Sequence, residues 1–214
     1  MNDRYILILG AGLMQRPSIE AAKELGYKAL VIDANPDAVC VPFADRFEKI
    51  DLKDTDAIVD FALSLGKKLC AVFTAGTDFS VPVSLACQKC GFTSHSFEAA
   101  MNASNKILMR ECFKKNKIPS PDFFEADESY IELFQKNKTS EIHFPKVVKP
   151  VDNMGARGCR LVRNRDEFLP ALKDAVCFSR TKKAIVEDFM EGPEFSIDAL
   201  VVNGKVVIAG FADR

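Results

Sequence analysis

The sequence has no long hydrophobic run and no excess of charge of one sign. No stretch approaches the roughly 20 apolar residues that a membrane-spanning helix needs, and the amino terminus lacks the charged and then apolar pattern of a secretory signal. Its 29 basic and 30 acidic side chains give a net charge of −1, which favours neither nucleic acid nor anionic lipid as a partner. We therefore expect a cytoplasmic protein that acts on small molecules.

The chain also has no cysteine framework. Its seven cysteines are odd in number and scattered, which predicts reduced thiols. Cys87 and Cys90 are the only close pair, and they lie in an apolar segment with His95 as the only nearby histidine. A metal or redox role for this pair is therefore not favoured, and we interpret both residues as small buried hydrophobes.

The first hundred residues alternate apolar strands with amphipathic helices. Pro17 suits the first position of a helix that should bury Ile19, Ala22 and Leu25 and stop at Gly26. The alternation predicts an α/β fold with a doubly wound parallel sheet. The expected strands span 5–9, 29–32, 46–50 and 69–73, with the last of them buried, and the later helices span 54–65 and 81–90.

The pattern changes from residue 105 onward. A basic amphipathic helix over 106–117 is followed by Ile118-Pro119-Ser120-Pro121, whose prolines cannot continue it, which indicates a domain boundary. Asn203-Gly204 between two apolar runs is a strong hairpin signal. The remaining expected elements are helices over 128–135 and after Asn164, and strands over 146–149, 159–162, 184–186, 194–202 and 205–211.

A lysine at the end of an apolar strand carries the clearest chemical signal. Lys149 is followed by Pro150 and then by a loop that contains Gly155 and Gly158. The lysine can meet phosphate charge, and glycines let backbone N–H groups approach the same oxygens without a Cβ in the way. Acidic positions at 187–194, separated by a Gly-Pro turn, could then bond ribose hydroxyls and the adenine edge, so the segment predicts a nucleotide site.

The first glycine loop offers a second hypothesis. Gly10-Ala11-Gly12 follows the first strand and Asp33 ends the second, which is the outline of a dinucleotide fingerprint in an NAD(P)-dependent oxidoreductase. Gln15 stands where that pattern has Gly or Ala, so the loop could instead be a tight strand-to-helix turn. A third possibility is a crevice for a small substrate at the carboxyl ends of two strands, formed by Gly10, Gly12, Thr74, Gly76, Thr77 and Asp78.

Taken together, these motifs resemble the ATP-grasp superfamily, and within it the carboxylate–amine ligase branch that includes carbamoyl-phosphate synthase large subunits and glycinamide ribonucleotide synthetases. The resemblance covers essentially all 214 residues. It implies a pre-ATP-grasp domain over 1–103, a small ATP-grasp lobe over 104–186, and the start of a large lobe over 187–214. The expected architecture is thus a doubly wound sheet followed by an incomplete α+β ATP-grasp domain.

The resemblance also implies roles for individual residues. Lys106 is similar to the family's first ATP-binding lysine, Lys149 to its second, and the loop 152–158 to the mobile loop over the phosphates. The segment 187–190 resembles the linker whose backbone reads adenine, and Glu194 matches the ribose-binding position. From the residues alone, a solvated helix face with Arg110, Lys114 and Lys115 suits Lys106 better than a phosphate site, and Arg157 could merely solvate its loop. The implied ATP-binding set is Lys106, Lys149, Gly155, Arg157, Gly158, Glu187, Phe189, Met190 and Glu194.

The family chemistry implied is activation of a small carboxylate as an acylphosphate, with ATP and Mg²⁺, for attack by an amine. In the family the metal ligands lie late in the large lobe, and this sequence ends at Asp213-Arg214, so we expect no metal ligands here and a fragment without turnover. A nonenzymatic nucleotide-binding module is the corresponding alternative. An incomplete large lobe would expose apolar side chains such as Ile197 and Val207, from which we expect a homo-oligomer. The sequence identifies neither the carboxylate nor the nucleophile.

Overall fold

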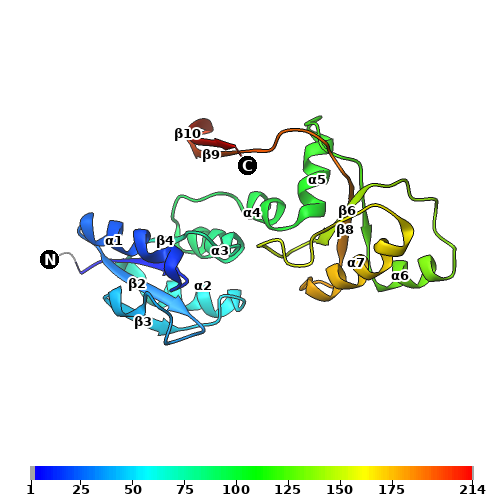
Figure 1. Ribbon diagram of the computed structural model, residues 1–214. Helices are drawn as coiled ribbons and strands as arrows, with labels where there is room; N and C mark the ends of the chain where they lie inside the picture. The colour runs from blue at the N-terminus through cyan, green and yellow to red at the C-terminus, as the bar shows by residue number, and fades with distance from the viewer. Residues whose placement is uncertain (1–2, 214) are drawn as a thin grey trace.

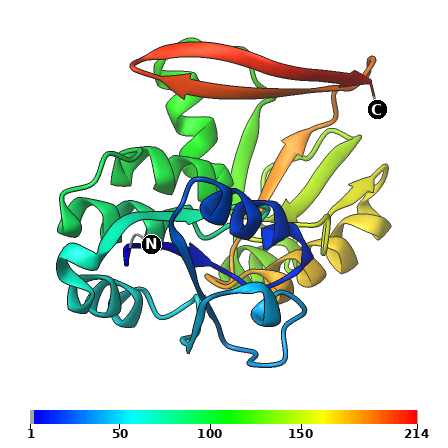
Figure 2. The same ribbon diagram turned by 90° about the vertical axis from the view of Figure 1, so that its left-hand side faces the viewer.

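The computed structural model describes residues 3–213, which form two α/β lobes and a carboxyl-terminal hairpin (Figures 1 and 2). In Figure 1 the hairpin stands apart from both lobes. Within residues 3–213, no helix combines the length and the apolar character that crossing a membrane requires. The mixed α/β fold with a parallel sheet, as expected from the sequence, is confirmed.

The first lobe is built on a parallel sheet with the order β3-β2-β1-β4. Its strands are β1 (Tyr5–Leu9), β2 (Lys28–Asp33), β3 (Arg46–Lys49) and β4 (Leu69–Thr74). Its helices are α1 (Arg16–Glu24), α2 (Thr55–Ser64), α3 (Ser80–Cys90) and α4 (Phe97–Ser104), with short 3-10 turns at Leu13–Gln15, Val41–Phe43 and Gly66–Lys68.

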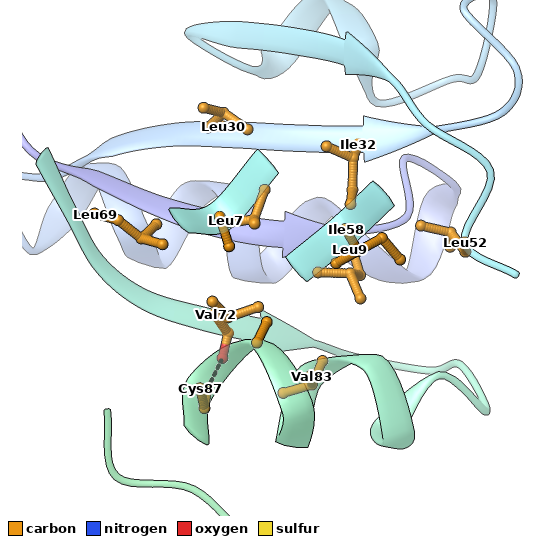
Figure 3. Close-up of a cluster of buried hydrophobic side chains, with 12 residues drawn as sticks. Leu7, Leu9, Leu30, Ile32, Leu52, Ile58, Leu69, Val72, Val83 and Cys87 are labelled. Atoms are coloured by element: carbon orange, nitrogen blue, oxygen red, sulfur yellow. Dashed lines mark hydrogen bonds between the residues drawn. The ribbon is translucent and has the colours of Figure 1, made fainter. Parts of the chain in front are cut away.

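Alternate residues of the strands supply two separate cores, one on each face of this sheet. Leu7 and Leu9 of β1 pack with residues of α2 and α3 (Figure 3), whereas Ile8 packs with Ile19 and Ala22 of α1 on the other face. A period of two along a strand places neighbouring side chains on opposite faces. Helices therefore cover both faces, as a doubly wound sheet requires.

Three details of the first lobe differ from the sequence expectation. Leu25 is 71% exposed because it follows the last turn of α1 and lies about 120° around the helix from Ile19. Phe73 is half exposed because β4 is an edge strand of the sheet. The helix α4 was not predicted, although Ser96 caps it by accepting a hydrogen bond from the Ala99 N–H.

The second lobe contains an antiparallel sheet with the order β5-β8-β6-β7. Its elements are α5 (Lys106–Lys115), β5 (Phe123–Ala126), α6 (Glu128–Gln135), β6 (Lys146–Pro150), β7 (Arg160–Val162), α7 (Arg165–Phe178) and β8 (Ala184–Asp188). The short strand β5 was not predicted, because Pro119 and Pro121 obscured its start.

The two faces of this second sheet have different environments. Val148 and Val186 point into the main core, together with Phe168 of α7. On the opposite face, Ile185 of β8 packs against Ile107 of α5. Since side chains alternate along β6 and β8, Lys149 and Glu187 share this second face with α5. The sheet thus holds two charged side chains beneath a basic helix.

The carboxyl-terminal hairpin pairs β9 (Phe195–Val202) with β10 (Lys205–Asp213), and its two-residue turn was predicted correctly. Asn203 and Gly204 both adopt positive φ, as this type of hairpin turn requires. Apolar side chains are exposed along both strands. The large ones are Phe195, Ile197, Leu200, Val201, Val202, Val206, Val207, Ile208 and Phe211.

Candidate functional site

A cleft of about 540 Å³ lies between the two lobes and brings together residues that are far apart in the sequence. Lys106 and Lys149 both line it, as do Gly155 and Arg157 of the glycine loop. The first lobe contributes Thr77, Asp78 and Ser80. The two lysines that the sequence indicated as phosphate ligands therefore face one cavity, although they come from a helix and from a strand. The complete lining is Thr77, Asp78, Ser80, Ala103, Ser104, Lys106, Met109, Lys149, Pro150, Asp152, Asn153, Met154, Gly155, Ala156, Arg157 and Cys159.

Lys106 begins α5, directly after its cap. The Asn105 side chain accepts hydrogen bonds from two N–H groups of the first turn, and the Lys106 N–H donates to the Val151 carbonyl at 2.9 Å. The Lys106 ammonium turns inward and donates to the Asn153 carbonyl at 2.7 Å. Burial lowers the pKa of Lys106, and the nearby positive charge of Lys149 lowers the pKa further. Lys106 is thus a cleft residue and is not part of a solvated helix face.

Lys149 belongs to a partly buried three-residue ion network. Its Nζ lies 2.5 Å from Glu187 Oε2, and the Arg110 Nε donates to Glu187 Oε1 at 2.8 Å. The Glu187 side chain is only 4% exposed. One carboxylate therefore fixes a cation of the sheet and a cation of α5 on the same face. The sequence did not assign this role to Arg110, because its position in a basic helix is typical of a solvated residue.

The glycine loop between β6 and β7 needs both of its glycines in the left-handed region. Gly155 has φ +71° with open space beside it, whereas a Cβ on Gly158, at φ +73°, would meet Phe178 at 2.9 Å. Arg157 folds back on its own loop and donates to the Asn153 side-chain oxygen at 3.1 Å. The backbone at Gly158 therefore lies close to Phe178, away from the cleft, while Gly155 and Arg157 line the cleft.

The base of this loop is held by an interaction that sequence reasoning missed. The buried Asp152 carboxylate accepts hydrogen bonds from the Ser179 hydroxyl at 2.8 Å and from the N–H groups of Arg180 and Thr181 at 2.9 Å each. Burial acts to raise the pKa of Asp152, but these hydrogen bonds outweigh it and hold the pKa below its usual value. No recognisable motif surrounds residues 179–181, so no local pattern indicated this interaction.

Arg180 connects the two lobes. Its guanidinium donates from Nε and Nη2 to the Asp152 carbonyl, at 3.1 and 2.6 Å. The same Nη2 lies 2.5 Å from Asp78 Oδ2 in the first lobe, 102 residues away in sequence. Asp78, which the sequence placed in a substrate crevice, therefore reaches the loop base through Arg180.

The Gln15 side chain fills the space inside the first glycine loop. Gln15 is 3% exposed and donates to the Ala75 carbonyl, and its side chain lies 3.1 Å from the position of a Cβ on Gly10. A Cβ on Gly76 would meet Met14 at 2.7 Å. Of the six residues predicted to form a crevice here, Thr77 and Asp78 line the interlobe cleft, whereas Gly10, Gly12, Thr74 and Gly76 are absent from its lining.

Asp33, the other part of the dinucleotide hypothesis, is also engaged within the protein. Its carboxylate accepts hydrogen bonds from the Ala11 N–H at 2.8 Å and from the Asn35 N–H at 2.9 Å. The Thr74 hydroxyl donates to the Leu9 carbonyl at 3.0 Å. These contacts hold the ends of β1, β2 and β4 together, as expected of a tight strand-to-helix turn at Gly10-Ala11-Gly12.

The predicted adenine and ribose residues follow the end of β8. The Phe189 N–H donates to the Pro145 carbonyl at 3.4 Å, and the side chains of Phe189 and Met190 are 38% and 66% exposed. Glu194 is exposed and directly precedes β9. These three residues do not line the interlobe cleft, so their nucleotide roles stay predictions. Among residues 3–213 there is also no group of three or more His, Cys, Asp or Glu side chains placed to hold a metal ion.

Comparison with known proteins places this geometry in context. A family model described as ATP-grasp domain matches residues 103–213. The fold is similar to that of an L-amino acid ligase from Bacillus licheniformis, with a TM-score of 0.77 at 20% identity over 100% of this chain. It is also similar to phosphoribosylglycinamide synthetase from Anaerococcus prevotii, with a TM-score of 0.67 at 26% identity over 98% of this chain.

A third similar structure is N5-carboxyaminoimidazole synthetase from Staphylococcus aureus complexed with ADP, with a TM-score of 0.76 at 19% identity over 98% of this chain. The present chain covers 51% of each of the first two proteins and 54% of the third. It thus spans about half the length of the proteins that it resembles.

Proposed function

The chain belongs to the ATP-grasp domain family, and from this premise we propose that it binds ATP in the interlobe cleft as part of an ATP-dependent carboxylate–amine ligase. The convergence of Lys106 and Lys149 on one cleft, beside a glycine loop, is the observation that carries this proposal. A triphosphate carries about four negative charges, and cations from separate elements lower the repulsion that an attacking nucleophile meets.

The residues of the cleft have distinct roles in this proposal. Lys106 and Lys149 stabilise the transferring phosphoryl charge, and the N–H groups around Gly155 approach its oxygens. Glu187 keeps Lys149 and Arg110 in position. Phe189, Met190 and Glu194 bind adenine and ribose. The substrate carboxylate attacks the γ-phosphate in line and ADP leaves, and an amine then displaces phosphate from the acylphosphate and loses a proton as the amide forms.

Magnesium would neutralise charge between the phosphates when bound. The described residues offer no cluster of carboxylates for it, so we assign no ligand to it among them. We further propose that the chain of 214 residues binds nucleotide without ligase turnover, a proposal that its half-length relative to similar ligases supports. Formation of an amide by the purified chain with ATP would contradict this.

A dinucleotide-dependent oxidoreductase is not favoured by the packing. The Gln15 side chain lies against Gly10 and Gly12, and both Asp33 oxygens accept hydrogen bonds from backbone N–H groups. The positions that would approach a pyrophosphate and a ribose are therefore already in contact with protein atoms. NADH binding that is abolished by Asp33→Ala would restore this alternative.

Nucleotide titration tests the proposal directly. Isothermal calorimetry with ATP should give a dissociation constant for the wild type that rises about tenfold or more in Lys149→Met, because a charged contact to phosphate is lost. Lys173→Met on the exposed side of α7 is the matched control and should leave affinity unchanged. Equal affinities in all three proteins, or no ATP binding at all, would overturn the assignment of the cleft.

The exposed apolar hairpin supports a homo-oligomer. Nine large apolar side chains of β9 and β10 are exposed, which is unusual for a monomeric surface. An unpaired strand edge adds hydrogen-bonding groups to that surface. A strictly monomeric mass by light scattering at all concentrations would contradict this part of the proposal.

A further inference from the structure

A second cavity lies beside the nucleotide cleft, with a volume of about 500 Å³. It shares Asp78, Ser104 and Asp152 with that cleft, and Arg180 lies in its wall. A ligand in this cavity would therefore sit next to the predicted phosphate site without occupying it. Pockets of a few hundred Å³ are typical of small-molecule sites. The complete lining is Leu52, Lys53, Thr55, Asp78, Phe79, Val81, Pro82, Met101, Ser104, Asn105, Asp152, Arg180 and Thr181.

The cavity has an apolar side and a charged end. Leu52 and Pro82 are buried, and Phe79, Val81 and Met101 are half-buried, so the first lobe supplies an apolar wall. Its charged residues are Lys53, Asp152 and the Asp78–Arg180 pair, and the pair joins the two lobes. Such a division suits a small molecule with an apolar body and an ionic head group.

The pair at the charged end is unequally anchored. Arg180 is held by two hydrogen bonds to the Asp152 carbonyl, which do not depend on Asp78. Asp78 contacts the same guanidinium through a single bond at 2.5 Å, and the pair is partly exposed, with side chains 42% and 24% accessible. A ligand carboxylate could therefore take the place of Asp78 while the guanidinium stays in position.

Charge balance then selects the class of ligand. A simple carboxylate that displaced Asp78 from Arg180 would leave one carboxylate without its cation. An α-amino acid avoids this, because its carboxylate can pair with Arg180 while its ammonium pairs with Asp78. One ion pair of the protein is exchanged for two with the ligand, and the net charge of the site does not change. We propose that this cavity binds an apolar α-amino acid as a substrate of the ligase, an inference that rests on the proposed function.

The test uses three probes with one carbon skeleton: L-leucine, 4-methylpentanoate, which lacks the ammonium, and L-leucinamide, which lacks the carboxylate. Dissociation constants are measured by NMR titration without nucleotide. Wild-type protein should bind L-leucine most tightly, by about tenfold over either analogue, because each analogue loses one charged pair.

Two substitutions give results of opposite sign. Asp78→Asn should weaken L-leucine by about tenfold and should tighten 4-methylpentanoate, because the competing carboxylate is gone and only leucine needs it. Arg180→Met should weaken both carboxylates and leave L-leucinamide unchanged. Arg160→Met removes an exposed arginine that pairs with Asp174, and it should change none of the constants.

Asp78→Asn preserves the shape of the side chain, so its result stands even if Arg180→Met disturbs the loop base. A loss of both leucine and 4-methylpentanoate in Asp78→Asn, or no change in either, would overturn the proposal. The calorimetric ATP titration separates this failure from that of the proposed function. If the protein binds ATP but does not show the predicted affinities for L-leucine and its analogues, only the amino acid site is refuted. If it shows those affinities but does not bind ATP, the ligase assignment is refuted.

Discussion

Replacement of Glu187 by Gln should destabilise the second lobe strongly. The substitution keeps the size of the side chain but removes the only charge in the network that attracts both Lys149 and Arg110. The Glu187 side chain is 4% exposed and its partners are 20% and 17% exposed, so water replaces little of the lost interaction. Two like charges would then face one neutral amide.

The magnitude follows from this burial. Removal of one partner of a buried ion pair costs about 3–5 kcal/mol, and the slight exposure of both cations places Glu187→Gln near the lower end, at about 3 kcal/mol. For a chain of this length that loss lowers the Tm by about 6–12 °C. Circular dichroism or calorimetry at neutral pH and moderate salt measures the shift.

The control is Asp174→Asn, which breaks an exposed ion pair with Arg160 in the same lobe. It should shift the Tm by less than about 2 °C, since exposed pairs contribute little. A Glu187→Gln variant that melts within 2 °C of the wild type, by the same threshold, would refute the reasoning that one buried carboxylate holds the two cations together.

Three other predictions concern the cleft and its loop. Burial lowers the pKa of Lys106 from its ordinary 10.5, so the unfolded chain binds more protons than the folded protein in the alkaline range below 10.5. The free energy of unfolding should therefore rise with pH in that range. Urea unfolding at pH 7 and pH 9 should show a smaller rise for Lys106→Met than for the wild type. Gly158→Ala should destabilise the protein more than Gly155→Ala, because only a Cβ at position 158 would meet Phe178. Gly155→Ala should cost only about 1 kcal/mol, from the positive φ at that position. Equal urea midpoints for the two variants would contradict this. The pKa of Asp152 is held below its ordinary 3.8, so the contribution of Asp152 to the free energy of unfolding should be present above pH 3.8 and disappear as the pH falls through the lowered pKa. Acid unfolding of Asp152→Asn should therefore depend less on pH than that of the wild type.

Much of the fold could be predicted because local patterns determined it. Pro17 in the first turn of α1, the left-handed Gly26 after that helix and the Asn203-Gly204 turn each act within a few residues, and all three occur as expected. The prediction that Leu25 is buried was wrong, because it rested on the apolar character of the residue and not on its position around the helix. The prediction that Phe73 is buried was wrong, because a sequence pattern does not show which strand lies at the edge of the sheet.

The sequence indicated Lys106 and Lys149, which both line the cleft, but it did not indicate the residues that contact them. Lys149 was recognisable because a lysine at the end of an apolar strand, before a glycine loop, has few packing roles. The contacts between Arg110 and Glu187 and between Arg180 and Asp78 join residues 77 and 102 positions apart. Such pairs depend on how the lobes and the sheet assemble, which local spacing does not encode.

The cations predicted to meet phosphate all have partners within the protein: Lys149 in Glu187, Lys106 in the Asn153 carbonyl, and Arg157 in the Asn153 side chain. An anion bound as proposed would compete with these contacts for the N–H donors of the three cations, while Glu187 keeps Lys149 in position. Inorganic phosphate can reach few of these donors at once, whereas a polyphosphate chain can reach them together. Selectivity for nucleoside triphosphates over inorganic phosphate would then arise from the number of simultaneous contacts, without any contact to the base.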